Sequence, residues 1–183
     1  MKNQVPNSSI KHNFILQQGF CASEMIDVDN QYSALLFQPR IIGIAVFIAI
    51  LFQSPAIYLS LAGVLIWSVL LPRFNLFDVS YNIFIAQNNN KRKLSPAPPP
   101  RKFAQSIAGL LVLIIGVAIL LAWYVTAYVV QGLLAGALIS LNFGSFCLGS
   151  FLYLHIRGKA KFARRTAPWR SHKKNPFSAV HSS

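Results

Sequence analysis

The sequence predicts an all-α integral membrane protein with four transmembrane helices arranged as two hairpins. Residues 41–71 and 103–156 contain no Lys, Arg, Asp or Glu. Overall, 54% of the residues are hydrophobic and 11% are charged, whereas about 25% are charged in typical soluble domains. Because one crossing of a hydrocarbon core about 30 Å thick takes about 20 helical residues, the second block must cross at least twice. This composition excludes an ordinary soluble domain.

Residues 1–33 form a polar N-terminal segment. No apolar run in it is long enough for the core of a secretory signal peptide, so we expect none. Cys21 and Cys147 are too few for a disulfide framework. Asp27 and Asp29 lack the Gly and the closing Glu of a calcium loop. We therefore expect neither a metal nor another cofactor.

The first hairpin is predicted over residues 34–72. Two apolar stretches, Ile41–Phe52 and Ala56–Leu71, flank the sequence Gln53-Ser54-Pro55. Ser54 suits a helix N-cap and Pro55 suits the first position of a new helix, where its missing N–H is not needed. Two short helices meeting at a polar turn are the favoured interpretation. One long helix kinked at Pro55 is the alternative.

Residues 73–102 are predicted to be a cytoplasmic loop. Its first part has aromatic residues at helical spacing opposite polar ones, which would suit a helix lying in the membrane interface. The aromatic positions are Phe74, Phe77, Tyr81 and Phe84, and the polar positions are Asn75, Asp78 and Asn82. Residues 88–90 are all Asn and four of the five residues 96–100 are Pro, which indicates an extended linker.

The second hairpin is predicted over residues 103–156. It divides near Trp123, Tyr124 and Tyr128, because aromatic side chains with a polar edge gather at membrane interfaces. One helix should therefore run from about Phe103 to Trp123 and the other from about Tyr128 to Ile156. The second helix carries small residues every four positions, a spacing that lets another helix approach closely. These are Gly132, Gly136, Ser140 and Gly144.

The basic residues predict the orientation. They gather in the central loop and in the tail 157–183, and neither hairpin turn contains any. Because Lys and Arg beside membrane helices stay in the cytoplasm, both termini should be cytoplasmic, in a bacterial inner membrane or another energy-transducing membrane. The tail should contact anionic lipids first, an acidic face of a partner protein second, and nucleic acid least. Its basic residues are Arg157, Lys159, Lys161, Arg164, Arg165, Arg170, Lys173 and Lys174.

The last predicted helix contains Phe146-Cys147-Leu148-Gly149-Ser150-Phe151-Leu152-Tyr153. This stretch resembles the Phe-Cys-x-Gly-Cys-x-x-Tyr signature of a bacterial family of small four-helix membrane proteins catalogued as a domain of unknown function. Gln38-Pro39-Arg40 and the run from Pro99 to Gln105 also fit that family's pattern. The resemblance covers about residues 33–156 and implies the same two-hairpin fold.

The sequence departs from the family signature at Ser150, where the second cysteine would stand. Two thiols three residues apart could exchange a disulfide, whereas Cys147 alone can form only a mixed disulfide, a sulfenate or a persulfide. On a continuous helix Cys147 would lie about 13 Å into the membrane, where apolar surroundings blunt a thiol. Cys147 is the one candidate catalytic residue, with Ser150 as its neighbour, and a structural thiol is the favoured interpretation.

Three functional hypotheses follow. The leading one is a non-enzymatic accessory or scaffold subunit that packs against a larger membrane complex or a second copy of itself. The second is a membrane thiol protein that uses Cys147 in redox chemistry or sulfur transfer. The third is a pore or carrier for a small neutral solute, suggested by Asn142, Ser145 and Ser150. Neither charge-free block holds a carboxylate, which argues against proton- or cation-coupled transport.

Overall fold

The computed structural model describes residues 5–20, 28–71, 75–87 and 97–168, and within these ranges every regular element is a helix. Three of these helices are long and apolar enough to cross a membrane: α2 (Val28–Phe52), α5 (Pro99–Leu120) and α6 (Tyr124–Gly144). The predicted all-α class is confirmed, and these three apolar helices agree with a membrane protein. The prediction of four spanning helices is corrected to three, because α3 (Pro55–Leu70) has 16 residues and is only about 24 Å long.

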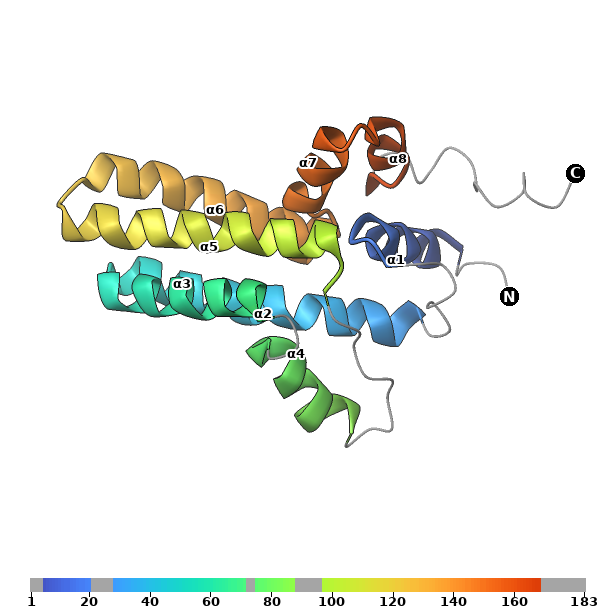
Figure 1. Cartoon of the computed structure of the whole chain (residues 1–183), viewed down its shortest axis with the longest axis horizontal. Coiled ribbons are helices and arrows are strands. Elements are labelled where there is room, and N and C mark those ends of the chain that lie inside the picture. Colours follow the sequence, from blue (N-terminus) through green and yellow to red (C-terminus); the bar gives the residue numbers. More distant parts are fainter. Residues whose placement is uncertain (1–4, 21–27, 72–74, 88–96, 169–183) are drawn as a thin grey trace, which may run out of the picture.

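The four long helices α2, α3, α5 and α6 lie side by side along the long axis of the molecule (Figure 1). The connections α2–α3 and α5–α6 lie together at one end, and the shorter helices α1 (Val5–Gln17), α7 (Leu148–Ile156) and α8 (Ala160–Arg165) lie at the other. The apolar core is formed mainly by α2, α3 and α5, with Val46, Tyr58, Leu65, Val112 and Ile115 fully or almost fully buried. The accessory helices α1, α7 and α8 therefore gather at one end of the bundle only.

The first hairpin is confirmed, and the single kinked helix is wrong. Helix α2 ends at Phe52, Gln53 adopts a left-handed φ of 45°, and α3 begins at Pro55. Ser54 occupies the predicted N-cap position, although its side chain makes no capping hydrogen bond. The Gln53 side chain instead donates to the carbonyl of Ile50 at 2.8 Å. Pro39 lies inside α2, because that helix starts at Val28.

The N-terminal segment, expected only to be polar, contains a helix. Helix α1 (Val5–Gln17) packs against α2, with Phe14 and Ile15 completely or almost completely buried (Figure 1). Phe14 also makes an edge-to-face ring contact with Tyr32 of α2, at 5.4 Å between centroids. The apolar run Phe14-Ile15-Leu16 is too short to span a membrane, yet it is long enough to attach one helix to the bundle.

A helix forms where the interfacial helix was predicted, but it does not bury and expose the residues that the sequence pattern predicted. It consists of α4 (Leu76–Tyr81) followed by a π-helical turn, η3 (Asn82–Ala86). The polar residues Asn75 and Asp78, expected to face water, are buried, whereas Phe84 is 70% exposed. The expectation was wrong because both polar side chains bind partners inside the protein. Phe74 and most of the predicted linker lie outside the described residues.

The second hairpin turns at residues 121–123, as the aromatic cluster predicted, with Ala122 at a φ of 57°. The predicted continuous helix to Ile156 is wrong, since α6 ends at Gly144 and a separate helix α7 (Leu148–Ile156) packs against α5. Ser145 takes a left-handed φ of 51°. Its hydroxyl lies 2.6 Å from the Tyr32 hydroxyl. The break redirects the chain, and the start of the basic tail forms α8 (Ala160–Arg165).

Candidate functional site

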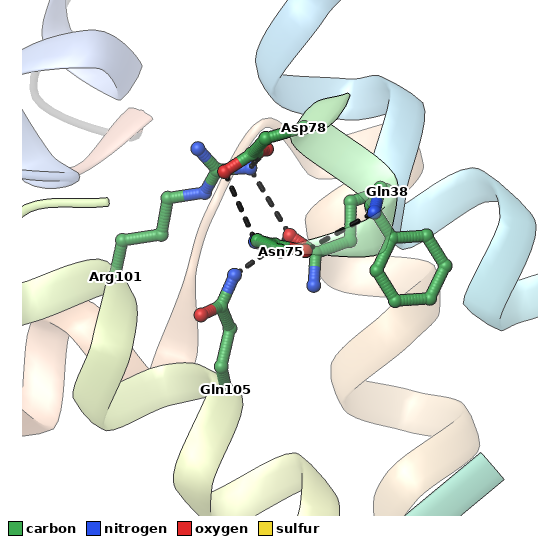
Figure 2. A network of polar contacts seen from close by, with 6 residues as sticks. Gln38, Asn75, Asp78, Arg101 and Gln105 are labelled. Atoms are coloured by element: carbon green, nitrogen blue, oxygen red, sulfur yellow. Dashed lines mark hydrogen bonds and ion pairs between the residues drawn. The ribbon is translucent and has the colours of Figure 1, made fainter. Parts of the chain in front are cut away.

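The described residues contain one buried polar network, at the end of the bundle where α2, α4 and α5 meet (Figure 2). Helix α5 supplies Arg101 and Gln105, which are four residues apart and so share one helix face. Helix α2 supplies Gln38, and the start of α4 supplies Asn75 and Asp78. All five are buried, with exposed fractions of 7% or less.

Arg101 is the centre of the network. Its Nη2 donates to Asp78 Oδ1 at 2.9 Å and to Gln38 Oε1 at 3.0 Å. Gln105 donates to the same Gln38 oxygen at 2.7 Å. Figure 2 shows these side chains converging from three different helices. The network therefore joins the first hairpin, the second hairpin and α4.

Asp78 is held by the local structure of α4. Asn75 is the N-cap of that helix and accepts a hydrogen bond from the Phe77 backbone N–H at 3.1 Å. The Asn75 amide then donates to Asp78 Oδ2 at 3.0 Å. A buried charge is tolerated only when it is paired and its remaining polar atoms are bonded. Asn75 and Arg101 together provide this for both carboxylate oxygens.

Three polar atoms of the network have no hydrogen-bond partner: Arg101 Nη1, Gln38 Nε2 and Gln105 Oε1. Their three residues line a cavity of about 80 Å³, with Cys147, Gln18 and apolar side chains completing its wall. Buried polar atoms are almost always bonded to protein or to ordered water, and this volume has room for a few waters or a small ligand. The cavity thus combines a cation, three amides and a thiol.

Cys147 is 5% exposed and is the N-cap residue of α7, beyond the end of α6 rather than in the middle of a helix. Its backbone N–H donates to Gln17 Oε1 of α1 at 3.1 Å. Burial raises the pKa of the Cys147 thiol above its ordinary value, and the adjacent Ser150 and Arg101 oppose this more weakly. The thiol is therefore protonated at neutral pH. Cys21 lies outside the described residues.

Ser150, at the position of the family's second cysteine, is completely buried. Its hydroxyl donates to the carbonyl of Pro100 at 3.3 Å. The other residues proposed for a solute path also have partners inside the bundle. Asn142 donates to the Leu138 carbonyl at 2.9 Å, and Ser145 bonds Tyr32. The three side chains bond different helices and are not brought together at one site.

The small-residue stripe on α6 faces away from the other described helices. A Cβ added at Gly132 or Gly136 would meet nothing within 4 Å. A Cβ at Gly144 would meet only the Ser140 hydroxyl of the same helix, at 3.8 Å. Of the basic residues predicted to contact lipid, Arg157 follows α7 and Lys159 precedes α8, whereas Lys161, Arg164 and Arg165 lie within α8. Arg170, Lys173 and Lys174 lie outside the described residues.

Sequence reasoning placed Arg101, Gln105 and Gln38 in family-like motifs but did not connect them with Asp78. Two signals could have done so. Asp78 is the only acidic residue between the two apolar blocks. Arg101 and Gln105 have the i, i+4 spacing of one helix face, which requires the helix to start before Phe103. It does start earlier, at Pro99.

No curated protein and no solved structure matches the chain. The family model described as "Domain of unknown function (DUF4395)" matches residues 32–157, a range that includes all five network residues and Cys147. Because this match covers more than half of the sequence, the chain belongs to the DUF4395 family.

Proposed function

We propose that this protein is a non-enzymatic membrane subunit whose α6 packs against a membrane helix of a larger complex. The observation that carries the proposal is the open glycine face of α6, where Gly132 and Gly136 have no neighbour within 4 Å of an added Cβ. Within its most apolar window α6 is only 22% buried, against 39% for α2 and 33% for α5. A helix that lacks neighbours but presents small residues can be approached closely by another helix.

A groove beside this face has the shape that an incoming helix needs. It has a volume of about 660 Å³ and lies between α2 and α6. The groove is lined by small residues, including Gly43 and Ala135. It is also lined by two exposed aromatic residues, Phe47 (62% exposed) and Phe143 (87% exposed). Small residues allow close backbone approach, and large ones supply contact area on either side. We take the occupant to be one apolar helix of another chain.

The proposal places the bundle in a bacterial inner membrane, with α2, α5 and α6 as its full-length spans. The two hairpin connections lie at the same end of the bundle (Figure 1), so α3 returns toward the end from which α2 came, although it is short for a full span. Local thinning of the bilayer can accommodate a short helix at modest cost. The basic residues between positions 157 and 165 lie at the end of α7 and in α8, at the opposite end of the bundle (Figure 1), which favours a cytoplasmic location for that end.

The test is purification of the tagged protein from its native membrane in mild detergent, followed by mass spectrometry. We expect a stoichiometric companion to bind the wild-type protein and to be lost from the Gly132→Leu/Gly136→Leu variant. Gly63→Leu is the matched control, because Gly63 on α3 also has open space around it. A companion retained equally by both variants would exclude α6 as the docking helix. A chain that purifies as a lone monomer would overturn the proposal.

A second candidate function is favoured by the cavity beside Cys147. A thiol that lines the same wall as the Arg101 guanidinium could accept the outer sulfur of a donor persulfide, which leaves as a thiol, and the cation would stabilise the anion of the resulting Cys147 persulfide. Complementation of a deletion strain discriminates the two functions. This candidate expects Cys147→Ala to fail, whereas the packing subunit expects Cys147→Ala to complement and Gly132→Leu/Gly136→Leu to fail.

A further inference from the structure

A second groove lies at the basic end of the molecule, separate from the polar cavity and from the α6 face. It has a volume of about 610 Å³ and is formed where α1, the start of α5, α7 and α8 meet. Its wall includes two cations, Arg157 and Lys159, and no carboxylate. The remaining residues that line it are mostly apolar or aromatic: Leu16, Gly19, Phe20, Pro99, Pro100, Tyr153, Leu154 and Phe162.

The backbone places the two cations on either side of one turn. Gly158, with a φ of 72°, ends α7, and its N–H donates to the His155 carbonyl at 3.1 Å. The Lys159 N–H donates to the Leu154 carbonyl at 2.9 Å, which completes the Schellman pattern of a helix C-terminus. The Arg157 guanidinium is further held over the Tyr153 ring, 5.6 Å from its centroid. The turn thus fixes two positive charges beside one groove.

These charges are not used by the carboxylates that the structure describes. Asp29 pairs with Lys11 at 2.6 Å, and Asp78 pairs with Arg101 at 2.9 Å. Arg157 and Lys159 are both exposed. The groove therefore offers two hydrogen-bonding cations to an anion from outside the chain, and Arg in particular suits the oxygens of a phosphate group.

The rest of the wall indicates what the anion belongs to. Phe20 and Leu154 are buried beneath the groove, and Phe162 is 40% exposed at its surface. The prolines offer no N–H donor to a polar ligand. The floor is also closely packed, because a Cβ on Gly19 would lie 2.8 Å from Pro100 Cδ. A free phosphate would leave the apolar wall unused, whereas a phospholipid has acyl chains to cover it.

We propose that this groove binds an anionic glycerophospholipid, with its phosphate between Arg157 and Lys159 and the upper part of its acyl chains against Phe20, Leu154 and Phe162. The groove lies at the end of the bundle where α7, a nine-residue apolar helix, gives way to the basic α8. Basic pockets beside membrane helices are established sites for anionic head groups. The proposal does not depend on the packing role of α6.

The test measures retention of phosphatidylglycerol against phosphatidylcholine by native mass spectrometry of the detergent-purified full-length protein. Arg157→Gln/Lys159→Gln removes the two groove cations. Arg164→Gln/Arg165→Gln is the matched control, because it removes the same charge from α8 at positions that do not line the groove. We expect the groove variant to retain phosphatidylglycerol about tenfold less than the wild-type protein, and the control to stay within about twofold. All three proteins should have the same circular dichroism.

The other outcomes contradict the proposal. An equal loss of phosphatidylglycerol in both variants would mean that the lipid is attracted diffusely to basic charge and has no specific binding site. Equal retention of the two lipids by the wild-type protein would exclude head-group selectivity. In a competition arm, millimolar inorganic phosphate should not displace the lipid. Full displacement would identify a phosphate-ion site in place of a lipid site.

Discussion

Helices α5 and α6 form one hairpin and both carry glycines at helical spacing, but only those of α5 meet another helix. A Cβ on Gly116 would lie 2.9 Å from Leu59 Cδ2, and one on Gly109 would lie 3.3 Å from Leu65 Cβ, both on α3. The corresponding space beside Gly132 and Gly136 on α6 is open. The spacing of small residues thus identifies a helix that can be approached closely, but not whether the neighbour belongs to the same chain.

The same two helices differ in their polar residues. Helix α5 places Arg101 and Gln105 in the buried network, whereas Gln131 of α6 bonds Gln53 at the hairpin end, at 3.1 Å. Helix α5 therefore carries both the closely packed glycines and the buried charge. Substitutions along α5 and its contacts should destabilise the fold, whereas substitutions on the open face of α6 should not.

The largest effect is expected from Asp78→Ala, which leaves Arg101 buried without its carboxylate. Losing one partner of a buried ion pair costs about 3–5 kcal/mol, because the remaining charge stays desolvated. Asp29→Ala is the matched control, since Asp29 is also ion-paired but its side chain is 79% exposed. Its loss should cost at most about 1 kcal/mol. Unfolding in detergent by chemical denaturant measures both, and equal losses would contradict the importance of the network.

Smaller effects on the unfolding free energy are expected from two glycine-to-alanine substitutions. They should have opposite signs at a closely packed glycine and at an open one. A Cβ on Gly149 of α7 would lie 2.7 Å from the Ala104 Cα on α5. Because that neighbour is backbone and cannot move aside, Gly149→Ala should destabilise the protein by about 1–3 kcal/mol. Gly132→Ala should stabilise it by about 0.5–1 kcal/mol, since alanine favours a helix and nothing obstructs it.

The same denaturant series measures both glycine variants. A loss of stability in Gly132→Ala would mean that α6 already has a close neighbour in the purified protein. A neutral Gly149→Ala would mean that α7 can move away from α5. Either result would remove the distinction between the two helices.

Hydropathy and charge were sufficient to predict the helical class, both hairpins and the position of each turn. The reason is physical: the bilayer sets the length of an apolar run, and Pro55 and the aromatic residues near Trp123 mark its ends. The break at Ser145 escaped prediction because Phe146-Cys147-Leu148 continues the apolar run and no proline interrupts it. After the break, Gly149 lets α7 approach α5 closely, because a Cβ there would lie 2.7 Å from the Ala104 Cα.

The polar network escaped prediction for a related reason. Asp78 has the spacing of a solvent-facing residue on an amphipathic helix, and nothing local distinguishes it from one. Its burial depends on Arg101, which lies 23 positions later in the sequence. Periodicity describes a helix by itself and therefore misses pairs formed between helices. The lone acid of the central loop and the lone arginine at the start of α5 become meaningful only together.

The break after α6 also determines the chemistry of Cys147 and leads to the smallest expected effect. Because burial raises the pKa of this thiol above its ordinary value of 9.0, the folded protein keeps a proton that the unfolded chain releases. As the pH rises through 9.0, the unfolded state therefore binds fewer protons than the folded state. Cys147 should then lower the folding stability progressively. The sign is that of an acid whose folded pKa is raised.

The prediction is tested on a Cys21→Ser background by comparing the wild-type residue with Cys147→Ala. The difference in unfolding free energy between them should be constant from pH 7 to about pH 8.5 and then shift in favour of the alanine variant. Taking the difference removes the shared titration of Lys and Tyr side chains. A constant difference up to pH 10 would mean that the thiol ionises as readily in the folded protein as in the unfolded chain. Such an accessible thiol would strengthen the sulfur-transfer candidate, because it would supply a thiolate that the buried environment otherwise suppresses.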